Sequence, residues 1–157
     1  MDGYFFDGNT GIMFYRDGTV VNQFDAFVYD HKFESYFDKL KTDPKEKTIF
    51  EYGSGNPYWG VFLIKSDTII VDEINHPTPL DALWMAWEIK YKIIDKNTIR
   101  KIDEEPLWTM TPAWEYVEFK KSMAKKHFPD AHFVPAPNRP DSINWLKKER
   151  WFWCKGK

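Results

Sequence analysis

Two hairpin patterns lie close together in the middle of the chain. Residues 58–74 contain two β-rich runs that meet at the polar pair Ser66-Asp67. In residues 87–93, four large apolar side chains alternate with three charged ones. A period of two is typical of a strand that buries one face. We therefore expect antiparallel hairpins at residues 58–74 and 86–102, and we expect them to form the centre of the scaffold.

The first of these hairpins is apolar on both faces. Phe62 and Ile64 lie on one face of the predicted strand, and Val61 and Leu63 lie on the other. Strands that are apolar on both faces are usually covered on both sides. We therefore expect this hairpin to be buried inside the molecule.

Shorter β-type runs surround the two hairpins. They are predicted at residues 3–6, 12–16, 19–28 and 45–52, with a short edge strand at 131–134. Asp17-Gly18 separates the second and third runs, and an Asp-Gly pair between β-rich runs is a strong hairpin signal. The chain thus reads as a series of short strands joined mostly by tight turns.

Two segments have helical spacing instead. Phe33, Tyr36, Phe37 and Leu40 recur every three or four residues within 30–41, with Asp30 as a candidate N-cap and Pro44 just beyond the end. Residues 111–126 begin with Thr-Pro, a typical helix start, and would turn Trp114, Val117 and Met123 inward. A strand at residues 114–119 is the alternative, and we favour the helix.

The order of these elements predicts one domain over residues 1–157 with a mainly β (α+β) fold. Residues 1–103 would form an antiparallel β-meander with the helix at about 31–41, and 111–157 would supply a helix, a Pro-rich loop and an aromatic-basic C-terminal segment. We expect the meander to curl into a closed or half-open barrel, because closure removes exposed strand edges. An open α+β sheet with a helix across one face is the alternative.

The repeated hairpins restart in the same way, at Asp67-Thr68-Ile69 and at Asn97-Thr98-Ile99. In this rhythm the chain, over residues 3–103, resembles the lipocalin-like (calycin) β-barrels. It reads Gly3-Tyr4-Phe5 where lipocalins have Gly-x-Trp, and its helix precedes the later strands. The resemblance implies an interior cavity for a small apolar ligand and no catalysis.

Aromatic residues make up 18% of the chain and include eight Trp. So many rings must fill a core, line a cavity or form an exposed patch. We therefore expect a binding protein that holds a small apolar or amphipathic ligand in the barrel. The residues expected to line the site are Tyr58, Trp59, Phe62, Trp87 and Tyr91.

The alternative function is a protein-interaction module of the inhibitor or immunity type. Residues 1–110 carry 12 Lys and Arg against 19 Asp and Glu, or −7, whereas residues 111–157 carry 10 against 5, or +5. Either the acidic body or the basic, aromatic C-terminal segment could bind a partner protein. The candidate interaction residues are Trp145, Lys147, Lys148, Arg150, Trp151 and Trp153.

Three other interpretations of the C-terminal segment stay open, and one is that it lies at a membrane surface. Trp151 and Trp153 could instead alternate into the core of a last strand. Basic residues interleaved with aromatic ones can also hold single-stranded nucleic acid, but nucleic acid is not the partner we expect.

Signals for catalysis and for metal binding are weak. No nucleophile, phosphate-binding or other catalytic motif is present, so we expect no enzyme and no cofactor. His127, Asp130 and His132 are possible metal ligands, but their spacing matches no common site, and we expect solvated polar side chains and no bound metal. His76, near Asp72 and Glu73, is a weaker candidate of the same kind.

No sequence run is long enough for a membrane-spanning helix, and the N-terminus lacks a signal-peptide pattern. We expect a soluble protein, cytoplasmic if Met1 is the native start. A location in the cell envelope or outside the cell is expected if an export segment preceded it.

Overall fold

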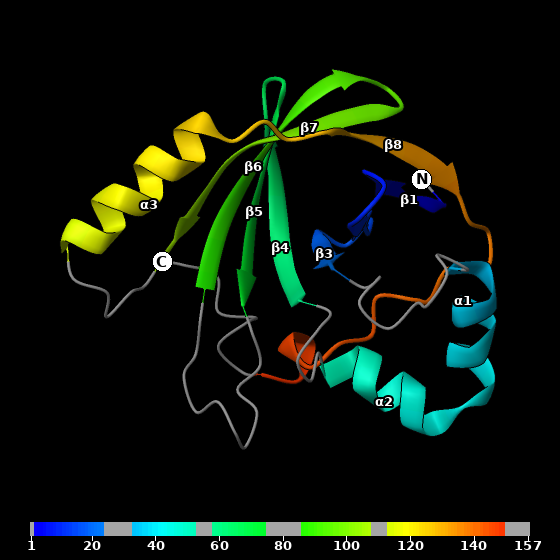
Figure 1. Cartoon of the computed structure of the whole chain (residues 1–157). Coiled ribbons are helices and arrows are strands. Elements are labelled where there is room, and N and C mark those ends of the chain that lie inside the picture. Colours follow the sequence, from blue (N-terminus) through cyan, green and yellow to red (C-terminus); the bar gives the residue numbers. More distant parts are fainter. Residues whose placement is uncertain (1, 24–32, 53–57, 75–85, 108–112, 150–157) are drawn as a thin grey trace.

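The computed structural model of the chain is a closed antiparallel barrel of eight strands with three α-helices outside it (Figure 1). It describes residues 2–23, 33–52, 58–74, 86–107 and 113–149. Each strand pairs with the next one along the chain, and the last pairs with the first. The predicted fold class, a mainly β meander closed into a barrel with packed helices, is confirmed.

The strands differ in length around the barrel. The short ones are β1 (Gly3–Phe6), β2 (Gly11–Phe14), β3 (Thr19–Asn22) and β8 (Asp130–Pro135). The long ones are β4 (Tyr58–Lys65), β5 (Thr68–Ile74), β6 (Ala86–Asp95) and β7 (Thr98–Pro106). Both central hairpins therefore have the predicted positions, and Ser66 adopts a positive φ of 57° in the predicted turn.

β8 closes the barrel. It pairs with β1 through Tyr4 and Val134 and with β7 through Ile99 and Ala131 (Figure 1). The strand predicted at 131–134 is confirmed. Its placement at a sheet edge is wrong, because both edges of β8 are hydrogen-bonded to neighbours. The closure brings together strands from opposite ends of the chain.

Helix α3 (Ala113–Lys125) lies along the part of β7 that β8 leaves uncovered (Figure 1). Its contacts come from the face that carries Phe119 and Lys120. The expectation that Val117 faces inward is wrong, because that side chain is 49% exposed. Met123 is half-buried, and Trp114 belongs to the residues whose side chains are not described.

Helix α1 (Phe33–Thr42) confirms the prediction for residues 30–41. Its four apolar residues are all buried: Phe33, Tyr36, Phe37 and Leu40. The candidate cap Asp30 lies outside the described residues.

Helix α2 (Pro44–Tyr52) replaces the strand predicted at residues 45–52, so that prediction is wrong. The carboxylate of Asp43 accepts the backbone N–H groups of Lys45 (2.9 Å) and Glu46 (3.3 Å), which caps the helix. Pro44 stands in the first turn, where its missing N–H costs nothing. The β-branched residues of this segment favoured a strand, but its start has the chemistry of a helix N-terminus.

Two hydrophobic cores lie on opposite faces of the barrel wall. The core inside the barrel is built from Phe5, Ile12, Val20, Ile69, Val71, Ile89, Tyr91, Ile99 and Ala131. The core outside it joins the helices and the C-terminal segment to the wall, and includes Tyr4, Met13, Tyr15, Phe37, Phe50, Trp59, Trp145 and Leu146. Because successive residues of a strand face opposite ways, β1 to β4 supply both cores.

The outer core covers only the start of β4. Trp59 is fully buried, whereas Val61 and Leu63 on the same outer face are 37% and 53% exposed. The expectation that this hairpin is covered on both sides is therefore wrong. The described helices pack near the beginning of the strand and leave its far end open to solvent.

Candidate functional site

The interior of the barrel contains a packed core and two hollows. Val20, Val71 and Ile89 belong to the packed core and are at most 1% exposed. One hollow lies at the tips of the long hairpins, and the other lies at the β1–β2 turn and the segment before β8. They differ in chemistry, and we call them the apolar pocket and the polar pocket.

The apolar pocket has a volume of about 290 Å³. Its wall consists of Phe5, Phe14, Tyr15, Phe62, Ile64, Ile69, Ile93 and Ile99. The rings of Phe14 and Phe62 meet edge to face with their centroids 4.9 Å apart. Cavities that hold small ligands measure about 300–1,000 Å³, so this pocket suits a small molecule.

Charged side chains stand at the mouth of the apolar pocket. Arg16 comes from the turn after β2, and Asp95 and Lys96 come from the turn between β6 and β7. The Asp95 carboxylate accepts the backbone N–H of Asn97 at 2.7 Å, so part of its hydrogen-bonding capacity is used within the turn. The mouth therefore joins an apolar interior to a rim that carries two cations and one anion.

The polar pocket has a volume of about 240 Å³. The barrel wall contributes Ile12, Asn22, Tyr91, Lys101 and Ala131, and the adjoining segments contribute Asp7, Asn9, Thr10, Gln23, Lys126, His127, Phe128 and Pro129. Hydrogen-bonding side chains thus line one end of a barrel whose interior is otherwise mostly apolar.

A buried polar centre lies beside this pocket. Asn22 Nδ2 donates to Glu73 Oε2 at 3.0 Å, and Asn22 also hydrogen-bonds the side chain of Tyr91. Asn22 Oδ1 accepts the backbone N–H of Gln23, a residue held at a positive φ of 56°. This second bond fixes the orientation of the amide, so its donor group faces the carboxyl.

The environment of Glu73 raises its pKa to about 7. Burial is the largest cause, because the ionised carboxylate loses its hydration. The hydrogen bond from Asn22 and the charge of Lys101 oppose the rise, and the charge of Glu104 adds to it. Burial likewise raises the pKa of Tyr91 well above its ordinary value.

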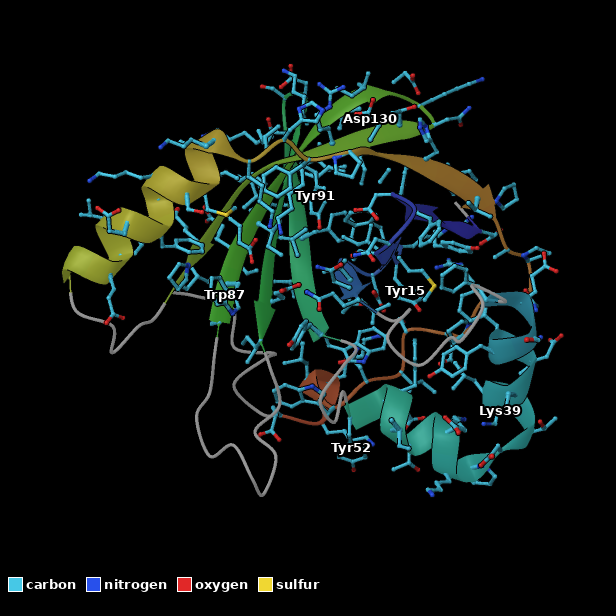
Figure 2. The ribbon with its side chains drawn as sticks, in the orientation of Figure 1. Tyr15, Lys39, Tyr52, Trp87, Tyr91 and Asp130 are labelled. Atoms are coloured by element: carbon cyan, nitrogen blue, oxygen red, sulfur yellow. The ribbon has the colours of Figure 1, made fainter. Side chains whose placement is uncertain are left out.

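Of the five predicted ligand residues, two line one of these pockets and three line neither. Phe62 lines the apolar pocket and Tyr91 lines the polar one. Trp87 is on the same strand face as Tyr91 (both labelled in Figure 2), and its ring centroid lies 6.0 Å from that of Phe119 on α3. Tyr58 lies opposite Asn22 in the sheet and is half-buried.

Trp59 faces away from the barrel interior. Its indole N–H donates to the carbonyl of Phe50 at 2.7 Å, and its ring stacks on Tyr15. Trp59 therefore fixes α2 to the barrel and lines neither of the two interior pockets.

The three candidate metal ligands have different surroundings. Asp130 forms a two-point ion pair with Arg100 at 2.6 and 3.0 Å, and His132 lies 3.5 Å from the hydroxyl of Thr98. His127 lines the polar pocket. In the described part of the chain, no group of three or more His, Cys, Asp or Glu side chains is placed to hold a metal ion.

The described part of the candidate interaction surface makes contacts within the chain. Trp145 is 2% exposed in the outer core, so its assignment to a surface is wrong. Lys147 pairs with Asp17 at 2.5 Å, and Lys148 lies over the ring of Tyr52. Arg150, Trp151 and Trp153 lie outside the described residues, as does His76, and their roles stay predictions.

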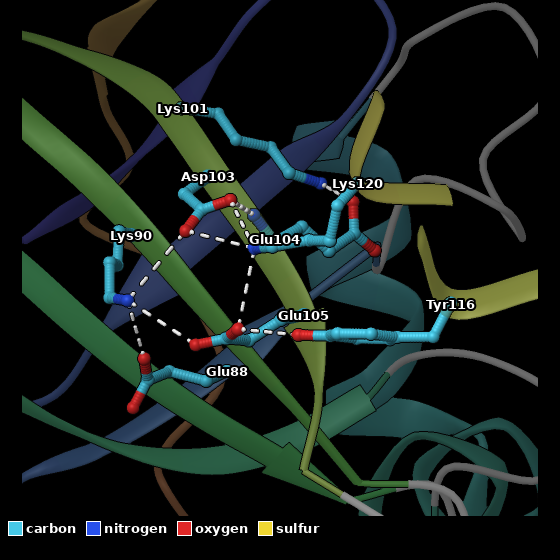
Figure 3. A network of polar contacts seen from close by, with 8 residues as sticks. All are labelled: Glu88, Lys90, Lys101, Asp103, Glu104, Glu105, Tyr116 and Lys120. Carbon is cyan, nitrogen blue, oxygen red and sulfur yellow. Dashed lines mark hydrogen bonds and ion pairs between the residues drawn. The ribbon is translucent and has the colours of Figure 1, made fainter. Parts of the chain in front are cut away.

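Outside the barrel wall, a network of charged residues attaches α3 to β7. Lys90 lies among the carboxylates of Glu88, Asp103 and Glu105 (Figure 3). From α3, Lys120 reaches Asp103 at 3.1 Å, and the hydroxyl of Tyr116 donates to Glu105 at 3.1 Å. Lys101 and Glu104 form a separate pair at 2.5 Å in the same view (Figure 3).

Sequence reasoning missed Asn22, Glu73 and Lys101. Glu73 was considered as a neighbour of the weak metal candidate His76, near the solvent-exposed end of its strand, yet its side chain is 3% exposed. Its position had a signal, since Ile69, Val71 and Glu73 are alternate residues and share one face. Nothing local indicated that Asn22 would lie opposite it.

No known protein family matches the chain, and comparisons with curated proteins and with solved structures find no significant match. Among the helices described, none has the length and apolar character needed to cross a membrane.

Proposed function

We propose that this protein binds a small apolar or amphipathic ligand at the hairpin end of a lipocalin-like barrel. The observation that carries the proposal is the apolar pocket of about 290 Å³, which is lined almost wholly by aromatic and aliphatic side chains. Transfer of apolar surface from water into such a pocket is favourable. The charged rim gives a place for the polar end of an amphipathic molecule.

The residues expected to contact the ligand belong to facing strands. Phe5 and Phe14 come from the short strands, Phe62 and Ile64 from β4, and Ile93 from β6. Arg16 and Lys96 would lie near the polar end of the ligand. No residue at this pocket has the arrangement of a nucleophile with its base, so the proposal is binding without catalysis.

The test is titration with a neutral fluorescent probe, N-phenyl-1-naphthylamine, whose emission rises in apolar surroundings. Ile64→Trp should fill the pocket and weaken binding by about tenfold or more, equivalent to about 1.4 kcal/mol. Leu63→Trp is the matched control, because Leu63 is the next residue on the same strand, is also exposed and does not line the pocket.

Equal probe binding by Ile64→Trp and Leu63→Trp would refute the assignment of the site. Absence of saturable binding to the wild-type protein would refute it as well. As a separate experiment, native mass spectrometry of the purified protein would identify any ligand carried from the cell.

A further inference from the structure

The polar pocket at the other end of the barrel has the features of a second binding site. It is distinct from the apolar pocket, because the two pockets share no lining residue. The amide of Asn22 and the phenol of Tyr91 line it, and the buried carboxyl of Glu73 accepts a hydrogen bond from Asn22. Burying such groups opposes folding unless they are hydrogen-bonded, and polar groups of this kind gather where proteins bind ligands.

Two of the three charged side chains that line the pocket are lysines, and the third is Asp7. The ammonium groups of Lys101 and Lys126 lie 5.3 and 5.2 Å from the centre of the Phe128 ring. His127 lines the same wall. Lys101 is already neutralised by Glu104 at 2.5 Å, so Lys126 is the cation best placed to meet a ligand.

The carboxylate among the lining residues is held by the backbone. Asp7 Oδ1 accepts the N–H groups of Asn9 at 2.8 Å and Thr10 at 2.6 Å. These bonds stabilise the carboxylate and use part of its hydrogen-bonding capacity within the turn. The pocket therefore favours a negatively charged molecule over a cation.

The apolar lining residues restrict the kind of anion. Ile12, Phe128, Pro129 and Ala131 form part of the wall, and a wholly polar ion such as phosphate would leave them in contact with water. We propose that the polar pocket binds a small organic acid, in which a carboxylate meets Lys126 and a short carbon skeleton packs against these residues. Asn9, Thr10 and Gln23 are positioned to hydrogen-bond its remaining polar atoms.

Isothermal titration calorimetry with succinate tests this proposal, with its neutral diamide, succinamide, and inorganic phosphate as comparison probes. Wild-type protein should bind succinate saturably at millimolar concentrations, and more tightly than either comparison probe. Lys126→Met should weaken succinate binding about five- to tenfold, the range for loss of one charge-assisted hydrogen bond.

Lys125→Met is the matched control, because Lys125 is also exposed and does not line the pocket. It should leave succinate binding unchanged, and so should Ile64→Trp at the opposite end of the barrel. The proposal is overturned if wild-type protein binds no succinate, if succinamide or phosphate binds as tightly, or if the two lysine variants weaken binding equally.

Discussion

Glu73 is the residue at which the interior of the barrel departs most from an ordinary core. It lies opposite Gly60 on β4 and Trp87 on β6, and Asn22 donates to it from β3. From β7, the charges of Lys101 and Glu104 act on it in opposite directions. The resulting pKa of about 7 links the stability of the fold to pH.

The sign of this linkage follows from the raised pKa. The folded protein holds a proton on Glu73 up to about pH 7, whereas the ordinary value is 4.5. Between these values the folded state binds more protons, so the contribution of Glu73 to stability decreases as pH rises, by roughly 3 kcal/mol in all. Glu73→Gln should remove this dependence and be more stable than wild type at pH 8.

Urea denaturation between pH 4 and pH 8 measures the effect. Glu118→Gln is the control, because the side chain of Glu118 is 64% exposed, and it should leave the pH profile unchanged. A wild-type profile parallel to that of Glu73→Gln would contradict the prediction.

Gly60 is a second residue whose role depends on its neighbours in space. A Cβ atom at this position would lie 2.2 Å from the carbonyl oxygen of Asp72 and 2.8 Å from the Cα of Glu73. Because both atoms belong to the backbone of β5, Gly60→Ala must separate the two strands. We expect a loss of about 3 kcal/mol in the free energy of unfolding, measured by urea denaturation.

Gly18→Ala separates this steric effect from glycine's conformational freedom. Gly18 has a φ of +86° and no heavy atom near its would-be Cβ, so only the backbone conformation is penalised, by about 1 kcal/mol. A loss for Gly60→Ala no larger than that for Gly18→Ala would show that β4 and β5 adjust without strain.

At the scale of elements, α3 covers part of the edge of β7, as a neighbouring strand does elsewhere in the barrel. Beyond Arg100, no described strand pairs with the outer edge of β7. Helix α3 contacts β7 through Lys120 and Tyr116, and its Phe119 contacts Trp87 of β6. Part of this attachment consists of ion pairs, and the paired side chains of Lys120 and Asp103 are each about one-third exposed. The helix should therefore be held less firmly than the strands.

Lys120→Met should loosen α3 while keeping most of the apolar side chain. Loss of the pairs with Asp103 and Glu105 should speed amide hydrogen exchange in the helix about two- to fivefold, since partly exposed ion pairs contribute about 0.5–1 kcal/mol. High salt should bring the wild-type rates towards those of the variant. Lys121→Met, whose partner Glu118 is on the same helix, should exchange like wild type, and equal acceleration in both variants would contradict this account.

At the scale of the whole molecule, the barrel wall separates two cores, and the outer core joins distant parts of the chain. Trp145 and Leu146 pack in it with Phe50 and Trp59. Figure 1 shows the C-terminal segment passing beneath the barrel to reach α2, and the backbone N–H of Trp145 donates to the carbonyl of Glu51 at 2.9 Å. Trp145 and Leu146 therefore attach the C-terminal segment to the outer core.

Leu146→Ala should lower the free energy of unfolding by about 3 kcal/mol, because Leu146 is 1% exposed and its truncation leaves a cavity. Ile143→Ala, in the same segment but 44% exposed, should change it by less than about 0.5 kcal/mol. Urea denaturation followed by tryptophan fluorescence measures both variants. Similar small losses would mean that the segment contributes little to the outer core.

The sequence by itself determined the features that depend on neighbours along the chain. Alternation located β6, the Asp17-Gly18 and Ser66-Asp67 turns located hairpins, and helical spacing located α1. The prediction from local sequence failed at residues 45–52. The β-branched residues there favoured a strand, but Asp43 caps a helix. Tertiary structure decided what depends on residues far apart: the closure by β8, the hollow ends of the barrel, and the pairing of Asn22 with Glu73 across 51 positions. These contacts form only when strands are brought together in space, so no local pattern carries them.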